Sequence, residues 1–250
     1  MELELAGKTA LVTGSSRGIG RAIAEALLAE GCRVVLNARG AGALNETAAA
    51  LECAAVAGDV TSALEARRVV DEAVAQLGRL DILVCNVGSG RSVPPGSETP
   101  EEWQRVFALN LWSATHTVEA ARPALVAARG AVVCISSICG LEVVTGAPVT
   151  YSAAKAALHA YVRGIARPLG LDGVRINAIA PGNILFADSV WQKKLATDTA
   201  AVQAMLEVHV SLRRLGTPRE IGELVAYLSS PRAAFATGAI WTLDGGQVRA

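Results

Sequence analysis

Short apolar runs rich in β-branched residues alternate along the chain with longer segments in which apolar residues recur at helical spacing. The short runs are typical of buried strands, and the longer segments are typical of amphipathic helices. The predicted strands are Thr9 to Thr13, Arg33 to Asn37, Ala54 to Ala57, Ile82 to Cys85, Ala131 to Ser136, Val174 to Ala180 and Ala239 to Leu243. The predicted helices include Gly18 to Glu30, Ser62 to Leu77, Pro100 to Ala128 and Ser152 to Leu169. Ser62, Thr99 and Thr217 are helix-capping residue types at the expected starts of helices.

Strand and helix alternate nearly from end to end, with no linker, low-complexity tract or internal repeat between the halves. Such alternation favours parallel strands joined by right-handed crossovers. We therefore predict one α/β domain over residues 1–250, a Rossmann-type doubly wound parallel sheet of about seven strands flanked by helices. Residues 183–212 form an unusually long, helix-biased connection, which indicates either a substrate lid or an ordinary surface insertion.

Composition adds to this picture. Apolar residues make up 52% of the chain and aromatic residues only 4%, so the core must be built from Ala, Val, Leu and Ile. That composition is typical of helices packed closely on a parallel sheet. Basic and acidic residues number 23 each and form no long run of one sign, which argues against a nucleic-acid partner and favours small-molecule chemistry.

The cysteines and the weakly polar segments indicate the cellular environment in which we expect the protein. The five cysteines lack paired short spacings and only three histidines accompany them, so we predict neither a disulfide framework nor a metal site. Residues 1–5 carry two glutamates and no basic region, and the weakly polar stretch 130–149 is interrupted by glycines and polar residues. We expect no secretory signal, no membrane span and a cytoplasmic location.

A glycine-rich turn follows the first predicted strand and leads directly into an Ala-rich helix. Gly14, Gly18 and Gly20 stand where the backbone must turn tightly and where helix N–H groups can face a phosphate. The spacing differs from G-x-G-x-x-G, and a tight connection without a ligand is the alternative. Its place at the first strand–helix junction of an alternating chain favours dinucleotide binding.

The end of the second strand bears on the choice of cofactor. Ala38 leaves no carboxylate there to bind the two hydroxyls of an adenosine ribose, whereas Arg39 offers a cation. Arg39, together with Arg17 in the glycine turn, is suited to pair with a 2′-phosphate. We therefore expect NADP(H) to be preferred over NAD(H), unless both arginines simply point into solvent.

The candidate catalytic residues fall at strand ends and on one predicted helix. Tyr151 and Lys155 are four residues apart, which puts the phenol and the ammonium on one helix face. A nearby ammonium favours phenolate, so Tyr151 is suited to act as a general acid or base. Ser136 and Ser137 close the fifth strand, where a hydroxyl can bind a substrate oxygen. For Asn110, within a predicted helix, an exposed or capping position is the ordinary expectation.

Taken in order, these motifs resemble those of the short-chain dehydrogenase/reductase family over nearly the full chain. The matching segments are Thr13 to Gly20 (TGxxxGIG), Asp59-Val60, Cys85 to Gly88 (NNAG in the family), the tetrad Asn110, Ser137, Tyr151 and Lys155, Asn177 to Gly182, and Thr237-Gly238 with Asp244 to Gly246. The candidate cofactor-binding residues are then Gly14, Ser16, Arg17, Gly18, Ile19, Gly20, Arg39, Asp59, Val60, Asn86, Gly88, Tyr151, Lys155, Pro181, Gly182 and Ile184.

The resemblance implies a role for each member of the tetrad. Tyr151 would transfer the proton, Ser137 would position the carbonyl, Lys155 would lower the pKa of the tyrosine and hold the nicotinamide ribose, and Asn110 would support a proton relay. This chain departs from the family pattern at Cys85 and Val87, at Leu185-Phe186 and in the spacing from Ser137 to Tyr151, which is one residue longer than in many members.

The function expected from these residues is the NADP(H)-dependent interconversion of a 3-oxoacyl or other ketone and a secondary alcohol. A sugar, polyol or secondary-alcohol dehydrogenase using NAD is a second interpretation, and a nucleotide-binding module without turnover is a third. The substrate is expected to be a small molecule, with linkage to an acyl carrier as one option. Asp172 argues against a docked acidic carrier, while Lys193 and Lys194 either compensate or only solvate the lid. Small apolar helix faces and the resemblance favour a homotetramer or a homodimer.

Overall fold

A computed structural model describes residues 2–248 of the chain. Its seven strands form one parallel sheet, as predicted, and their order is β3-β2-β1-β4-β5-β6-β7. The strands are β1 (Thr9–Thr13), β2 (Arg33–Ala38), β3 (Ala54–Ala57), β4 (Ile82–Cys85), β5 (Ala131–Ile135), β6 (Arg175–Pro181) and β7 (Ile240–Leu243). The strand order reverses between β1 and β4. In sheets of this type, ligands bind at that point, outside the carboxyl ends of the strands.

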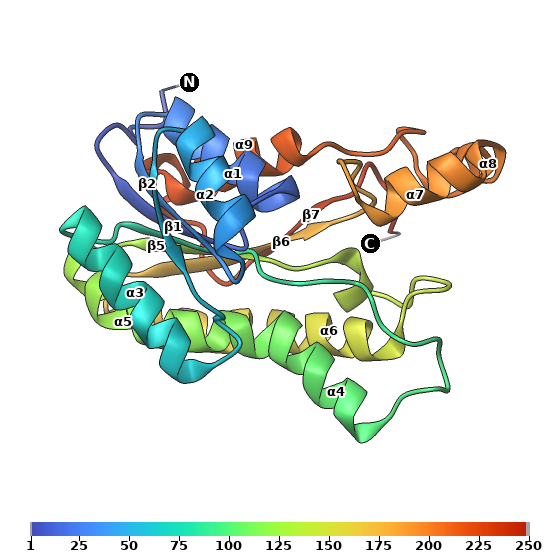
Figure 1. The fold of residues 1–250 in the computed structure, drawn as a ribbon, viewed down its shortest axis with the longest axis horizontal. Coiled ribbons are helices and arrows are strands. Elements are labelled where there is room, and N and C mark those ends of the chain that lie inside the picture. Colours follow the sequence, from blue (N-terminus) through green and yellow to red (C-terminus); the bar gives the residue numbers. More distant parts are fainter. Residues whose placement is uncertain (1, 249–250) are drawn as a thin grey trace.

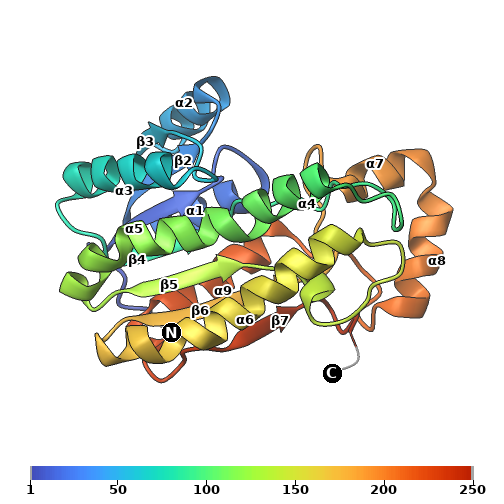
Figure 2. The same cartoon turned by 90° about the horizontal axis from the view of Figure 1, so that it is seen from below.

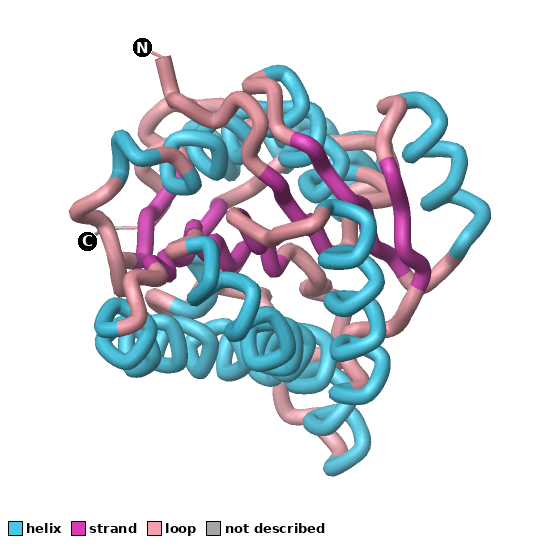
Figure 3. The backbone as a smooth tube through the Cα atoms, turned by 90° about the vertical axis from the view of Figure 1, so that its left-hand side faces the viewer, coloured by secondary structure: helices cyan, strands magenta, loops and turns pink. Residues whose placement is uncertain are grey.

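Helices cover both faces of the sheet (Figures 1 and 3). On one face lie α1 (Gly18–Ala29), α2 (Ala41–Ala50) and α9 (Pro218–Ser229). Figure 2 shows the other face, covered by α3 (Ala63–Leu77), α5 (Ser113–Ala128) and α6 (Val149–Leu171). Two apolar clusters fill the space between these layers. Successive residues of β1 enter opposite clusters, Leu11 one and Val12 the other, because strand side chains alternate between faces.

Capping side chains fix several helix starts. The Ser62 hydroxyl accepts a hydrogen bond from the Glu65 backbone N–H, and the Thr99 hydroxyl accepts one from Glu102. At α9, Thr217 and Glu220 form a reciprocal capping box. All three caps lie where the sequence predicted them.

The predicted helix from Pro100 to Ala128 is interrupted. It divides into α4 (Pro100–Phe107), a turn of π-helix at Ala108–Trp112 and α5. Two further features also differ from the prediction. Helix α6 begins at Val149, after Pro148 at the N-cap, and α2 was not among the predicted helices. Every residue of α2 except Leu44 is small or polar, so no clear apolar period marks this helix.

Two short helices, α7 (Val190–Thr197) and α8 (Thr199–His209), fill the connection after β6. They project beyond the carboxyl ends of the strands, to the right in Figure 1. Val202, Leu206 and Val210 form a small core of their own, separate from the two clusters beside the sheet. Such a segment has few contacts to hold it to the domain. No helix within residues 2–248 is long and apolar enough to span a membrane.

Candidate active site

The glycine turn lies at the carboxyl end of β1, beside the point where the strand order reverses. Gly14 and Gly18 have positive φ angles of 63° and 56°, which glycine adopts without steric cost. Gly20 has a different reason to be glycine. A Cβ at Gly20 would lie 2.3 Å from the Gly14 carbonyl oxygen and 2.5 Å from the Asn86 amide nitrogen, so the strand, turn and helix pack too closely for any side chain.

Asn86, at the end of β4, fastens this turn to the neighbouring strand. Its side-chain amide donates to the carbonyl oxygens of Thr13 at 3.1 Å and Gly14 at 2.9 Å, while its backbone N–H donates to the Thr13 hydroxyl at 3.0 Å. The amide of Asn86 therefore shapes the glycine turn.

Helix α1 begins at Gly18, directly after the turn. Its N-cap residue, Arg17, has an extended backbone, and no side chain among residues 2–248 caps the helix. The first N–H groups of α1, from Gly18, Ile19 and Gly20, are therefore available to an anion, and the helix dipole favours negative charge there. Thr47 supports the turn from α2 by donating its hydroxyl hydrogen to the Ser16 carbonyl at 2.8 Å.

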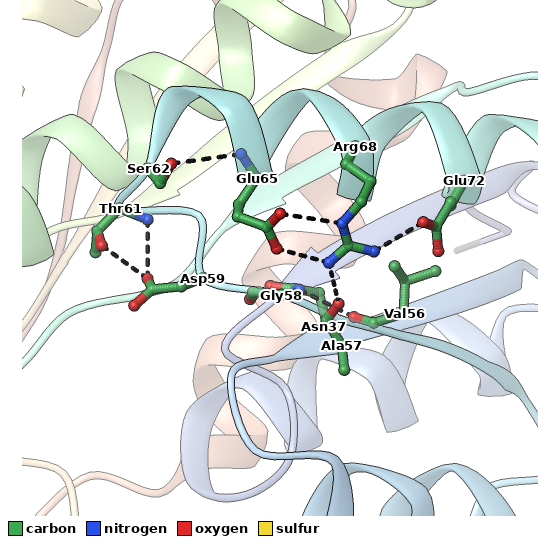
Figure 4. Close-up of polar contacts among 10 residues, drawn as sticks. All are labelled: Asn37, Val56, Ala57, Gly58, Asp59, Thr61, Ser62, Glu65, Arg68 and Glu72. Carbon is green, nitrogen blue, oxygen red and sulfur yellow. Dashed lines mark hydrogen bonds and ion pairs between the residues drawn. The ribbon is translucent and has the colours of Figure 1, made fainter.

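Arg39 follows β2 and extends into solvent, with 69% of its side chain exposed. Its guanidinium lies 3.8 Å from a carboxylate oxygen of Asp59, at the end of the neighbouring strand β3. The other Asp59 oxygen accepts hydrogen bonds from the Thr61 backbone and hydroxyl (Figure 4). Val60, the next residue, is buried. Arg17 is likewise exposed and lies 3.9 Å from Asp188.

Arg68 of α3 fixes the carboxyl end of β3. The guanidinium donates to the Ala57 carbonyl at 2.7 Å and is paired with Glu65 and Glu72 (Figure 4). Buried Asn37 adds two bonds, from its amide to the carbonyls of Val56 and Gly58. These contacts hold Asp59 and Val60 in place at the edge of the sheet.

Tyr151 and Lys155 stand four residues apart near the start of α6, on the face toward the carboxyl ends of β4 and β5. Lys155 is only 3% exposed, and its ammonium donates to the Ile135 carbonyl at 2.9 Å, at the end of β5. The same nitrogen lies 5.9 Å from the centre of the Tyr151 ring. Ser137 follows β5 with an extended backbone, and its hydroxyl is close enough to the Tyr151 phenol to act on its pKa.

Burial dominates the protonation of this pair. It raises the pKa of Tyr151 to about 12, against the opposing effect of the Ser137 hydroxyl, and it lowers the pKa of Lys155 to about 8. The pKa of Tyr151 in the protein alone is therefore raised overall, where the sequence had led us to expect a depressed value. Loss of hydration around the phenol is the largest effect, and the Lys155 ammonium is itself buried and bound to a carbonyl.

Asn110 occupies the π-helical turn and is only 1% exposed, contrary to the ordinary expectation of an exposed position. Its amide oxygen accepts from the Ser89 N–H at 2.9 Å, and its amide nitrogen donates to the carbonyls of Ser89 and Val106. Gly88 lies between two site residues: a Cβ there would be 2.9 Å from the Asn110 amide oxygen and 3.1 Å from the Lys155 nitrogen. The structure thus brings Asn110, Gly88 and Lys155 together.

A buried histidine, missed by the sequence analysis, supports the serine loop. His159 lies one turn beyond Lys155 on α6. Its Nε2 is 2.7 Å from the Ser136 hydroxyl oxygen, and its Nδ1 is 3.1 Å from the Gly140 carbonyl. Because a carbonyl only accepts, Nδ1 carries the hydrogen and Nε2 accepts from Ser136. Burial lowers the pKa of His159 to about 4, so the ring is neutral at pH 7. The sequence signal that could have identified His159 is its position eight residues after Tyr151, in the same predicted helix.

The end of β6 and the start of the long connection after it form the remaining side of the candidate active site. Pro181 is buried, the Gly182 N–H donates to the Leu243 carbonyl at 3.0 Å, and Ile184 pairs with Gly216. Phe186, where the family often has another residue, lies over the glycine turn: a Cβ at Gly18 would be 2.7 Å from its ring. The long connection therefore starts in contact with the candidate phosphate site.

Comparisons with known proteins identify the family and the fold. A family model described as enoyl-(acyl carrier protein) reductase matches residues 14–247. The chain is 40% identical over 247 residues to a protein of Streptomyces violaceoruber named as the candidate ketoacyl reductase 2 of granaticin polyketide synthase, covering 95% of this chain and 94% of that one.

Two solved structures have the same fold over the whole chain. L-Sorbose reductase of Gluconobacter frateurii, complexed with NADPH and L-sorbose, has a TM-score of 0.93 and 32% identity, with 100% of both chains covered. A 7α-hydroxysteroid dehydrogenase complexed with NADH and 7-oxo glycochenodeoxycholic acid has a TM-score of 0.90 and 31% identity, covering 100% of this chain and 97% of that one.

Proposed function

The chain belongs to the short-chain dehydrogenase/reductase family and is an NAD(P)-dependent oxidoreductase, and on this basis we propose that it reduces a ketone to a secondary alcohol with NADPH. Tyr151 is the proton donor of this reaction. The observation that carries the proposal is the convergence of Tyr151, Ser137 and Lys155 beside Gly88, at the carboxyl edge of the sheet. A 3-oxoacyl compound is the preferred substrate class, in line with the ketoacyl reductase relative.

The residues around the glycine turn fit a dinucleotide. Gly20 leaves the space that a Cβ would fill, and the first N–H groups of α1 face the turn without a side-chain cap among the described residues. Arg39 is the candidate partner of a 2′-phosphate, with Arg17 on the opposite side of the turn. Asp59, Val60, Asn86 and Ile184 complete the wall. When bound, the cofactor supplies the hydride.

Each remaining step belongs to a side chain of the protein. The Ser137 hydroxyl donates a hydrogen bond to the ketone oxygen and holds it next to the phenol of Tyr151. Tyr151 gives its proton to that oxygen as negative charge develops there. Lys155 stabilises the resulting phenolate with its positive charge, and Asn110, which binds the Ser89 backbone beside the site, would support a water-linked relay that returns a proton to Tyr151.

The protonation state supports reduction as the working direction. With a pKa of about 12, the phenol of Tyr151 is protonated at pH 7, which is the form that a general acid requires. Oxidation of an alcohol by the same residue requires phenolate and is therefore expected to become faster as the pH rises.

The test is a panel of ketones with NADPH, followed by the loss of nicotinamide absorbance. Tyr151→Phe should lower kcat at least 100-fold, since proton transfer by a positioned side chain contributes roughly 10²–10⁴-fold. The dissociation constant of NADPH, measured by fluorescence titration, should stay within several-fold. Comparable turnover in the wild type and Tyr151→Phe would overturn the role of Tyr151, and a complete lack of turnover with intact NADPH binding would favour a binding module. Oxidation of sugars or polyols with NAD, without ketone reduction, would favour the dehydrogenase interpretation.

A further inference from the structure

A cavity of about 460 Å³ lies between the lid helices and the loop that follows β4. Helices α7 and α8 supply nearly all of its lining, and Arg91 supplies the remainder from the opposite side. We use "lid cavity" for this space. None of its lining residues belongs to the catalytic tetrad or to the glycine turn.

The lining of the lid cavity combines an apolar floor with a cationic rim. Trp191, Val202 and Met205 contribute to the floor, and Val202 is 5% exposed. Lys193, Lys194 and Arg91 contribute three cations. The Lys194 ammonium lies 4.5 Å from the centre of the Trp191 ring, so this charge is held over the floor.

The charges at the rim are unbalanced. Within residues 2–248, no carboxylate is within ion-pair distance of Arg91, Lys193 or Lys194. Asp198 is the one carboxylate in the lining. One of its oxygens accepts from the Ala201 N–H at 2.9 Å and caps α8. Three cations against one carboxylate leave a net positive rim above an apolar floor.

The lid cavity lies close to the candidate active site along the chain and in space. Gly90, which precedes Arg91, lies against the catalytic tyrosine: a Cβ at Gly90 would be 3.7 Å from Tyr151 Cε1. On the lid side, the Asn183 amide is 3.9 Å from the Met205 sulfur, and Asn183 directly follows Gly182. The lid cavity therefore lies beside Tyr151, on the side where Gly90 and Arg91 follow each other in the chain.

We propose that the substrate is an elongated ketone with an apolar body in the lid cavity and an anionic group bound by Arg91, Lys193 and Lys194. The proposal rests on the ketone reduction proposed above and names the substrate class of the same site. The anion is either a carboxylate at the end of the chain or the phosphate of a pantetheine thioester, and both have the charge that the rim recognises. A neutral ketone gains only the apolar part of this binding.

The first experiment compares matched charged and neutral ketones. A series of methyl-ketone acids, from 5-oxohexanoate to 11-oxododecanoate, is assayed with NADPH beside the corresponding methyl esters. For at least one length, KM of the acid should be lower than KM of its ester by on the order of tenfold, the ratio that about 1.4 kcal/mol provides. The phosphate is tested in parallel with 3-oxooctanoyl phosphopantetheine against 3-oxooctanoyl pantetheine, the thioester that lacks only the phosphate.

The second experiment removes the cations. In Lys193→Gln/Lys194→Gln and in Arg91→Gln, the ratio of the two KM values should move toward one, while kcat with the charged substrate stays within twofold. Arg167→Gln is the matched control, because Arg167 is exposed on α6 and is not part of the cavity lining. This variant should keep the wild-type ratio.

The outcomes test the anionic subsite separately from the proposed ketone reduction. A gain with the acids identifies a carboxylate, and a gain only with the phosphopantetheine thioester identifies a phosphate. Equal KM values within every pair, or the same change of ratio in Arg167→Gln as in the lysine variant, would overturn the anionic subsite and leave ketone reduction intact. Competition by decanoate with a neutral ketone, weakened in the lysine variant, tests the same subsite without turnover of the acid.

Discussion

At the scale of single residues, burial and hydrogen bonding set the properties of the site more than sequence spacing does. Lys155 lies in the interior with one bond to the Ile135 carbonyl, and the phenol of Tyr151 loses hydration beside it. Removing a charged group from water costs far more than an exposed ion pair returns. Tyr151 is consequently a protonated acid, and Lys155 has a pKa close to neutral pH.

Arg39→Ala should reduce the preference for NADPH. A charge-assisted hydrogen bond to a 2′-phosphate contributes roughly 1.5–3 kcal/mol, which corresponds to about ten- to a hundredfold in affinity. We expect kcat/KM with NADPH to fall by at least tenfold and kcat/KM with NADH to change little. Arg21→Ala is the control, since this arginine of α1 pairs with Glu25 on the exposed side of the helix. An unchanged ratio of the two cofactors in Arg39→Ala would remove Arg39 from cofactor selection.

His159 should make the protein less stable in acid. Its pKa is about 4 in the folded protein and 6.5 in the unfolded chain, so the unfolded chain binds more protons between these values. The stability is present above pH 6.5 and is lost as the pH falls toward 4. We expect this single group to lower the free energy of unfolding by about 2 kcal/mol from pH 7 to pH 5, as measured by urea titration.

The His159→Gln variant provides the comparison for this pH effect. Glutamine offers both a donor and an acceptor to Gly140 and Ser136 and does not titrate. The difference in stability between pH 7 and pH 5 should therefore be smaller in the variant by about the same amount. Parallel pH dependence in the two proteins would contradict the assignment.

At the scale of elements, the carboxyl ends of the strands are fastened to one another by side chains rather than by the sheet alone. Asn86 joins the ends of β1 and β4, Arg68 joins β3 to α3, and Lys155 joins α6 to β5. The π-helical turn between α4 and α5 turns Asn110 inward. A local departure from α-helix of this kind is frequent at functional sites.

Gly20→Ala tests whether the close approach of β1, the turn and α1 is required. The new methyl group would lie 2.3 Å from the Gly14 carbonyl oxygen, and neither backbone segment can move freely because Asn86 holds both strands. We expect the dissociation constant of NADPH to rise by at least tenfold, measured by fluorescence titration.

Gly164→Ala is the control for this steric argument. Gly164 lies within α6, and a Cβ there meets nothing within 4 Å. Because alanine favours a helix over glycine by up to about 1 kcal/mol, this variant should be as stable as the wild type or more so and should bind NADPH normally. Equal NADPH affinity in Gly20→Ala would show that the turn can open to admit a side chain.

At the scale of the whole molecule, the structure is one sheet with two helical layers and a small separate core under the lid. Several large apolar side chains remain exposed outside these cores, among them Trp112 at 39% and Leu171 at 83%. Both lie at ends of helices that cover the same face of the sheet, α5 and α6. Helix faces of this kind commonly pair across a two-fold axis.

We expect the protein to be a homotetramer, or at least a homodimer, at micromolar concentration. Light scattering should give two or four times the chain mass of 25.8 kDa. Trp112→Glu should shift the population toward smaller species, because a carboxylate is costly to bury in an interface. The control Leu64→Glu removes a residue that is 79% exposed on α3 and should leave the mass unchanged. A monomeric mass for the wild type would refute the expectation.

Features that depend on neighbours along the chain could be predicted from the sequence. Strand positions follow from short β-branched runs, the starts of α3, α4 and α9 follow from capping residues, and the glycine turn follows from closely spaced glycines directly after a strand. The parallel order of the sheet also follows, since only crossover connections fit an alternation of strands and helices.

Tertiary structure alone decided the features that depend on contacts between distant segments. The amide of buried Asn110 is bound by Ser89 from the loop after β4, and His159 acquires its role only when β5 ends beside α6. The pKa of Tyr151 reversed the expectation from spacing, because hydration lost on burial is a property of the packed site. The lid cavity likewise exists only where α7 and α8 face Arg91, from the other side of the carboxyl edge.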